Sequence, residues 1–168
     1  SSNNNFSEFG TSGKSVTPID YDKDGDMDLL VGNRITPQSY PKSAPSFIFE
    51  NDGGIFKNVT EKIAPELSNF GIINKVIATD FDKDGWQDFI AVGEWTGIGI
   101  FQNQNGTFRD ISDESNLTNE KGWWFSVKNK NTQLEDNSFS IRYIQPNPIP
   151  MLMYERSAIL AFSTPLNL

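Results

Sequence analysis

Two short acidic stretches stand out in the sequence: D-Y-D-K-D-G-D-M-D at residues 20–28 and D-F-D-K-D-G-W-Q-D at residues 80–88. Together they hold nine of the 22 acidic residues in the 168-residue chain. Both have Asp at alternating positions before a single Gly, and both are followed by an apolar run that ends in Gly. Four or five carboxylates within nine residues repel one another unless a cation lies between them. The pattern therefore predicts two cation-binding loops.

Each position of the pattern has a role in a calcium site. Ca²⁺ takes six to eight oxygen ligands, at roughly 2.3–2.6 Å, from a loop that curls around it. Carboxylates at positions 1, 3 and 5 point inward, Gly at position 6 permits a sharp turn, position 7 offers its backbone carbonyl, and the Asp at position 9 closes the cage. The predicted ligands are Asp20, Asp22, Asp24, Asp26 (through its carbonyl) and Asp28 in the first site, and Asp80, Asp82, Asp84, Trp86 (through its carbonyl) and Asp88 in the second.

Other sites fit the two stretches less well. Mg²⁺ demands a tight octahedron and keeps its waters, and an EF-hand requires Glu at position 12, where this chain has Val31 and Ala91. A solvated acidic turn without a cation is the remaining alternative.

The chain contains no His and no Cys, which excludes thiolate zinc sites, iron–sulfur clusters, disulfides and His-dependent catalysis. Lys23 and Lys83 lie between ligand positions, and we expect both to face water.

The acidic stretches belong to a longer repeat. A Val stands four residues before each stretch, and segment 49–60 matches segment 101–112. Short β-branched and aromatic runs, separated by Gly, Asn and Asp, predict four strands in each unit. The predicted strands are about 15–20, 28–33, 46–51 and 54–60 in the first unit and about 74–80, 88–94, 97–103 and 106–111 in the second.

Four strands in a unit of about 50–60 residues is the period of a β-propeller blade. We therefore expect an all-β fold built from propeller blades of four antiparallel strands, two complete and a third begun. The blades are placed at about 10–67, 70–118 and 120–127, because G-W-W-F-S-V at 122–127 parallels G-I-I-N-K-V at 71–76. Aromatic residues that recur in register are expected in the core between blades: Phe49, Phe56, Phe101 and Phe108.

The amino-acid composition and the repeat pattern change after residue 127. No acidic loop follows the third blade start, and no Gly occurs from Trp123 to Leu168, although the chain has 13. Four of the nine prolines also lie in this part of the chain. Two interpretations of residues 128–168 stay open: a divergent blade or extension that packs on the sheet, or a non-native tail from a truncated or frame-shifted reading.

These motifs give the chain its family likeness. It resembles the FG-GAP/VCBS repeat proteins, which include the integrin α-subunit propeller, and the resemblance spans about residues 10–127. The F-x-N…G-x-F-x-x-V-T hairpin and the G-W-W blade opening are similar to bacterial proteins related to cartilage acidic protein 1. The resemblance implies that each acidic loop joins the first two strands of a blade and binds Ca²⁺. It also implies an extracellular, cell-surface or periplasmic location.

The expected function is that of a structural and interaction module in a secreted or surface protein, with two Ca²⁺ sites and no enzymatic activity. Its partner is a protein or a polysaccharide, and further blades of a parent chain are expected. An alternative is the non-catalytic propeller part of a larger secreted enzyme, such as a polysaccharide lyase. Trp95, Trp123 and Trp124 could form a stacking platform for a sugar or pack inside the blades. The net charge of −8 argues against nucleic acid, and no run of about 18 apolar residues predicts a membrane span.

Overall fold

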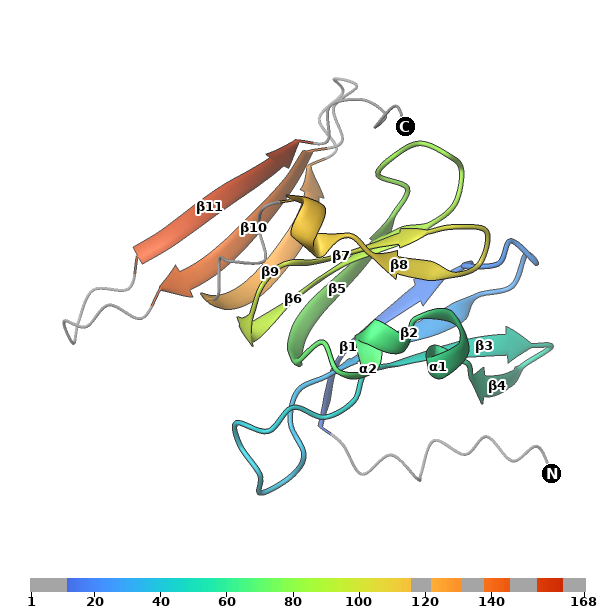
Figure 1. The fold of residues 1–168 in the computed structure, drawn as a ribbon, viewed down its shortest axis with the longest axis horizontal. Helices are drawn as coiled ribbons and strands as arrows, with labels where there is room; N and C mark the ends of the chain where they lie inside the picture. The colour runs from blue at the N-terminus through green and yellow to red at the C-terminus, as the bar shows by residue number, and fades with distance from the viewer. Residues whose placement is uncertain (1–11, 116–121, 131–137, 146–153, 162–168) are drawn as a thin grey trace.

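The computed structural model describes residues 12–115, 122–130, 138–145 and 154–161, and these form two antiparallel β-sheets with few helices (Figure 1). The expectation of an all-β fold is confirmed. The first sheet has its strands in chain order: β1 (Gly13–Ile19), β2 (Asp28–Asn33), β3 (Phe47–Asp52) and β4 (Ile55–Asn58). Two short helices, α1 (Thr60–Ile63) and α2 (Pro65–Ser68), connect this sheet to the next.

The second sheet begins with the same order of neighbours. Its first four strands are β5 (Ile72–Thr79), β6 (Asp88–Thr96), β7 (Gly99–Asn103) and β8 (Phe108–Asp110), followed by the 3-10 helix η2 (Ser112–Ser115). The end of β6 pairs with β9 (Gly122–Lys130), through Glu94 and Thr96. The sheet continues through β10 (Ser138–Gln145) and β11 (Tyr154–Ala161), which both pair antiparallel with their neighbours.

All eight strands predicted for the two units are present, and their ends differ from the prediction by no more than two residues. The differences fall at strand ends, where a turn can take over one or two residues without changing which side chains are buried. In the tail, the structure shows β10 and β11 where neither interpretation specified strands. Residues 10–11 and 116–121, which belong to the predicted blade boundaries, lie outside the described residues.

The core has two parts, one between the two sheets and one within the second sheet. Successive side chains of a strand point to opposite faces, and β6 shows this clearly. Phe89 and Ala91 belong to a buried cluster shared with Leu30 of β2, whereas Ile90 and Val92 belong to a second cluster that contains Trp124 and Val127 of β9. Both faces of β6 are therefore covered, and each fully buried large apolar side chain contributes roughly 1.5–3 kcal/mol.

Three of the four phenylalanines predicted for the core are buried. Phe101 stacks on Phe89 with ring centroids 4.4 Å apart, and Phe108 meets Phe89 edge-on at 4.8 Å. Phe49 is also buried. Phe56 is only partly buried, because it lies on the short strand β4 at the edge of the first sheet.

The first strands of the successive units lie side by side. Val76 of β5 donates its backbone N–H to Ser15 Oγ of β1 at 3.1 Å, and its carbonyl accepts from Thr17 Oγ1 at 3.0 Å. On the other side of β5, Asn74 Nδ2 donates to the carbonyl of Trp124 in β9 at 3.0 Å. Because an acidic loop follows β1 and another follows β5, this contact brings the two loops to the same end of the molecule (Figure 1).

Candidate metal centre

The acidic loops are the connections from β1 to β2 and from β5 to β6, and they have the same backbone turn. Lys23 and Lys83 have φ of 63° and 62°, and Gly25 and Gly85 have φ of 95° and 88°. Glycine populates this left-handed region at little cost, whereas residues with a Cβ rarely do. A Cβ on Gly25 would meet nothing within 4 Å, so the requirement for Gly there comes from the backbone and not from crowding. The predicted sharp turn at position 6 is present in both loops.

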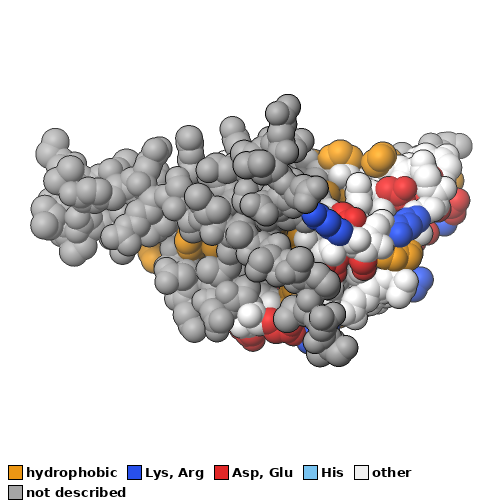
Figure 2. Space-filling view, turned by 90° about the horizontal axis from the view of Figure 1, so that it is seen from above, with side chains coloured by type: hydrophobic (Ala, Val, Ile, Leu, Met, Phe, Trp, Pro, Cys, Tyr) orange, Lys and Arg blue, Asp and Glu red, His pale blue; other side chains and the backbone are white. Residues whose placement is uncertain are grey.

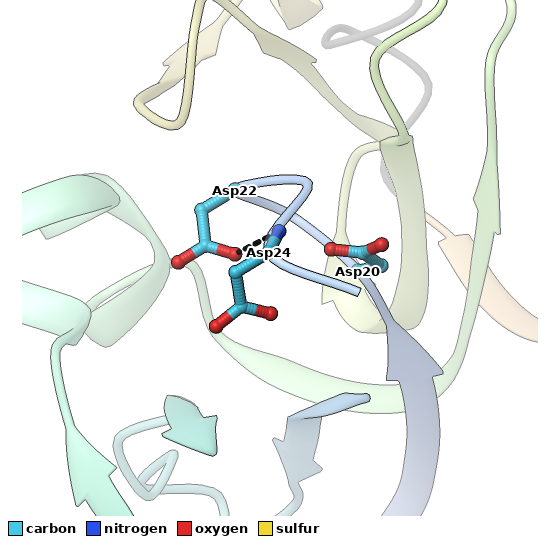
Figure 3. A group of neighbouring side chains, drawn as sticks. All are labelled: Asp20, Asp22 and Asp24. Atoms are coloured by element: carbon cyan, nitrogen blue, oxygen red, sulfur yellow. Dashed lines mark hydrogen bonds between the residues drawn. The ribbon is translucent and has the colours of Figure 1, made fainter. Parts of the chain in front are cut away.

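Six of the predicted ligand side chains converge in two groups. In the first loop, one carboxylate oxygen from each of Asp20, Asp22 and Asp24 lies within 4.8 Å of the others. Figure 3 shows Asp22 and Asp24 close together, joined by the hydrogen bond from Asp24 N to Asp22 Oδ1 at 3.2 Å, with Asp20 across the loop. The second group consists of Asp80, Asp82 and Asp88, again within 4.8 Å.

The remaining predicted ligands lie outside these side-chain groups. Asp84 Oδ1 accepts a hydrogen bond from Trp86 N at 2.8 Å, and Asp24 Oδ1 accepts one from Asp26 N at 2.9 Å. These bonds close matching tight turns, which place positions 5 and 7 of each loop next to each other. Asp26 and Trp86 are predicted to contribute backbone carbonyls, which belong to the same turns.

The position 9 aspartates, Asp28 and Asp88, are fully buried and hold each loop to a hairpin. Asp28 accepts backbone N–H groups from Tyr21 at 3.2 Å and Asn51 at 2.8 Å. Asp88 accepts them from Phe81 at 3.0 Å and Asn103 at 2.7 Å. All four carboxylate oxygens are thus used by the backbone, a role that the ligand pattern alone did not predict.

Burial shifts the ionisation of the position 9 side chains. The pKa of Asp28 is raised to about 6 and that of Asp88 to about 7, mainly by burial and with a smaller contribution from the neighbouring loop carboxylates, while the backbone N–H bonds oppose the shift. Burial also raises the pKa of Asp22 above its usual value. The direction is what a carboxylate cluster without a counter-ion requires, because protonation relieves both desolvation and repulsion.

Asn51 and Asn103 complete the hairpins that hold the loops, a role that the sequence analysis did not assign to them. Asn51 Oδ1 accepts from Gly54 N, and Asn103 Oδ1 from Gly106 N, both at 2.8 Å. Their recurrence in the F-x-N motif is the signal that could have identified them. Asn103 Nδ2 also donates to the Tyr21 carbonyl of the first loop at 2.8 Å, so it links the two units.

The two loops contact each other directly. Asp20 N donates to Gln87 Oε1 at 3.1 Å, and Lys23 Nζ lies 4.0 Å from the centroid of the Trp86 ring. Lys23 is exposed, as predicted, but its ammonium group also lies over the Trp86 ring of the second loop, a contact that the sequence did not predict. An ammonium group is attracted to the electron-rich face of an indole, and position 7 of the second loop supplies one.

The charge balance of the first loop favours a bound cation. Asp20 Oδ1 and Asp26 Oδ1 are buried and accept no hydrogen bond from the described residues. Three ion pairs of the described residues, Arg34–Glu94, Lys57–Asp52 and Arg109–Glu114, lie outside the first loop. Acidic and basic side chains lie next to one another at the right-hand end of the face in Figure 2. A buried carboxylate oxygen without a donor is costly, and a hard cation would satisfy it.

The three tryptophans that could form a sugar platform lie in different environments. Trp124 is buried in the core, and its Nε1 donates to the Thr96 carbonyl at 3.1 Å. Trp95 is 54% exposed and meets Trp123 edge-on, with ring centroids 5.4 Å apart. Trp124 is therefore a packing residue, whereas Trp95 is available at the surface.

No protein-family model matches this chain, and no curated protein sequence matches it significantly. The likeness to FG-GAP/VCBS repeats therefore stays a prediction that rests on the loop and hairpin motifs. None of the helices among the described residues has the length and apolar character needed to cross a lipid bilayer.

Proposed function

We propose that this chain is a calcium-binding β-propeller repeat segment of the FG-GAP/VCBS type, acting as a structural and interaction module of a secreted or cell-surface protein. One observation carries the proposal. Two acidic loops share the same left-handed turn and the same hydrogen bonds to a hairpin, and each brings three carboxylates within 4.8 Å. A chance acidic turn has no reason to recur with its supporting bonds in place.

The propeller arrangement is supported by how the units pack. Each of the first two units has four strands in meander order, and their first strands lie side by side. β6 is buried on both faces, as a blade between two neighbours must be. Blades pack face to face around an axis, so a repeated meander with two buried faces is the local geometry that a propeller needs.

Calcium would act on this module through stability and not through chemistry. Two bound Ca²⁺ ions would halve the net charge of −8. If each site has a dissociation constant near 0.1 mM, about 1 mM Ca²⁺ stabilises the folded state by roughly 1.4 kcal/mol per site. Extracellular fluids hold Ca²⁺ near that concentration, so weak sites of this kind fill there.

Thermal unfolding tests the proposal. The midpoint of the 168-residue chain should rise in 1 mM CaCl₂ relative to EDTA, and 1 mM MgCl₂ should have a much smaller effect, because Mg²⁺ keeps its waters. Asp113→Asn is the matched control, since Asp113 is an exposed acidic residue on η2, outside both loops. It should leave the calcium response unchanged. Equal responses to Ca²⁺ and Mg²⁺, or none to either, would contradict the proposal.

A further inference from the structure

A surface cavity of about 280 Å³ lies at the opposite end of β6 from the acidic loops. Asp88 begins β6 and Trp95 is close to its end, seven residues further along, which corresponds to about 23 Å of extended strand. The cavity is bounded by three segments: the 34–45 connection, the turn after α2 and the end of β6. Its lining includes Pro41, Phe70, Gly71, Glu94, Trp95 and Thr96.

Trp95 is exposed in a fixed and strained conformation. Its φ is 62°, a backbone region that bulky residues adopt only at a cost. Its side chain is 54% exposed, so burial does not repay that cost. The ring is held in orientation because Nε1 donates to Tyr40 Oη at 3.2 Å and Trp123 contacts it edge-on. Strain that persists at an exposed, oriented aromatic residue is a feature of ligand-binding positions.

The polar part of the cavity lining includes Glu94 and Thr96, and the charge of Glu94 is compensated by a residue behind the lining. Glu94, whose side chain is only 7% exposed, pairs through Oε1 with Arg34 Nη2. Beside this pair, Arg34 Nε and Thr96 Oγ1 are buried and have no hydrogen-bond partner among the described residues. The cavity therefore combines an aromatic face with a polar lining residue, Thr96, whose Oγ1 has unused hydrogen-bonding capacity.

This combination selects the charge of a ligand. A cation gains little from Glu94, because Arg34 already compensates its charge, and an anion would be repelled by Glu94 in a chain whose net charge is −8. A wholly apolar ligand would remove water from the ion pair without replacing its hydrogen bonds, which is costly. A neutral molecule with many hydroxyl groups and one apolar face avoids all three disadvantages.

We propose that this cavity binds one sugar ring of a neutral glycan, with the C–H face of the ring stacked on Trp95 and its hydroxyl groups directed to Glu94 and Thr96. The indole face is electron-rich and attracts polarised C–H groups. The cavity is slightly smaller than the range of about 300–1,000 Å³ that takes drug-sized ligands, which suits a single ring. This inference rests on the interaction role proposed above and names its ligand class, but it does not depend on the calcium sites.

The experiment uses four neutral oligosaccharides: cellohexaose, maltohexaose, mannohexaose and galactohexaose. At least one should show saturable binding to the 168-residue chain, followed by tryptophan fluorescence and by saturation-transfer NMR. Trp95→Gly should weaken binding at least ~30-fold, as loss of a central aromatic anchor does. Its unfolding midpoint should stay the same or rise, because Gly relieves the positive φ. Tyr40→Phe, which removes the acceptor for Trp95 Nε1, should weaken binding about 3- to 10-fold.

Phe125→Ala is the control, because Phe125 is an exposed aromatic residue outside the cavity lining, and it should bind as the unmodified chain does. The inference is overturned if none of the four oligosaccharides binds, or if Trp95→Gly and Tyr40→Phe both bind normally. Preference for tetramethylammonium or polygalacturonate would also overturn it. Calcium uptake measured on the same samples distinguishes the two proposals. Sugar binding without calcium uptake would refute the calcium sites but not the sugar site. Calcium uptake without sugar binding would refute the sugar site but not the calcium sites.

Discussion

At the scale of single residues, the loop aspartates divide into two kinds. Asp28 and Asp88 are fully buried and accept two backbone N–H groups each, whereas Asp24 and Asp84 are exposed and, among the residues that the structure describes, bond only within their own loop. The buried pair therefore supports the fold whether or not a cation is present. The exposed pair can matter to stability mainly through a bound cation.

Substituting one residue of each kind should separate these roles. Asp88→Asn places an amide NH₂ against a backbone donor inside the protein, so in EDTA it should lower the free energy of unfolding by about 1–3 kcal/mol. Asp84→Asn keeps an oxygen for Trp86 N, so in EDTA it should change stability little and instead reduce the stabilisation by Ca²⁺. Urea unfolding with and without Ca²⁺ measures both. Similar losses for the two variants in EDTA would contradict this division.

The buried aspartates also predict how stability depends on pH when metal is absent. Their folded pKa values, about 6 for Asp28 and about 7 for Asp88, lie above the unfolded value of about 3.9. The folded state therefore holds protons that the unfolded state has released. The stabilisation is fully present below about pH 4 and is lost as the pH rises through 6 and 7.

Metal-free protein should thus have a higher unfolding midpoint at pH 5 than at pH 8. A saturating Ca²⁺ concentration should oppose this trend, because Ca²⁺ binds the deprotonated carboxylates. The double variant Asp28→Asn/Asp88→Asn should lose most of the dependence. Metal-free stability that increases between pH 5 and pH 8 would show that these side chains are ionised in the folded protein.

At the scale of elements, the two hairpins look alike in sequence but differ in what they hold together. Asn103 Nδ2 donates to the carbonyls of Tyr21 and Gln87, at 2.8 and 3.1 Å, and the side chain is fully buried. Within the described residues, the corresponding Asn51 Nδ2 donates only to the Met27 carbonyl, at 3.2 Å, near the surface. The β7–β8 hairpin therefore connects both loops, whereas the β3–β4 hairpin supports one.

Alanine substitution of these two asparagines should expose the difference. Asn103→Ala leaves buried carbonyls without donors in two units and should cost roughly 3 kcal/mol, whereas Asn51→Ala should cost about 1 kcal/mol. Both variants lose the turn bond to a glycine N–H, so the difference reports the bonds between units. Urea unfolding gives the two values. Equal costs would mean that the link from Asn103 to the first loop contributes nothing.

At the scale of the whole molecule, the sequence predicted what is local and repeated. The eight strands and the left-handed turns at Gly25 and Gly85 follow from patterns that span fewer than ten residues. The contact of Lys23 with Trp86 and the pairing of Arg34 with Glu94 join residues about 60 positions apart. Such pairs depend on how one sheet packs on the next, and no single-strand pattern encodes that packing. The strands β10 and β11 lie where the repeat had ended, so periodicity could not place them.

If the two acidic loops are calcium cages, the folded chain binds two calcium ions, and counting the bound ions is the decisive measurement. Isothermal titration calorimetry of the folded 168-residue chain, freed of metal, should show two Ca²⁺ ions per chain. Asp24→Asn and Asp84→Asn should each reduce the number to one, and Asp113→Asn should leave it at two. No calcium uptake, or the same uptake by the loop variants and the Asp113→Asn control, would contradict the account.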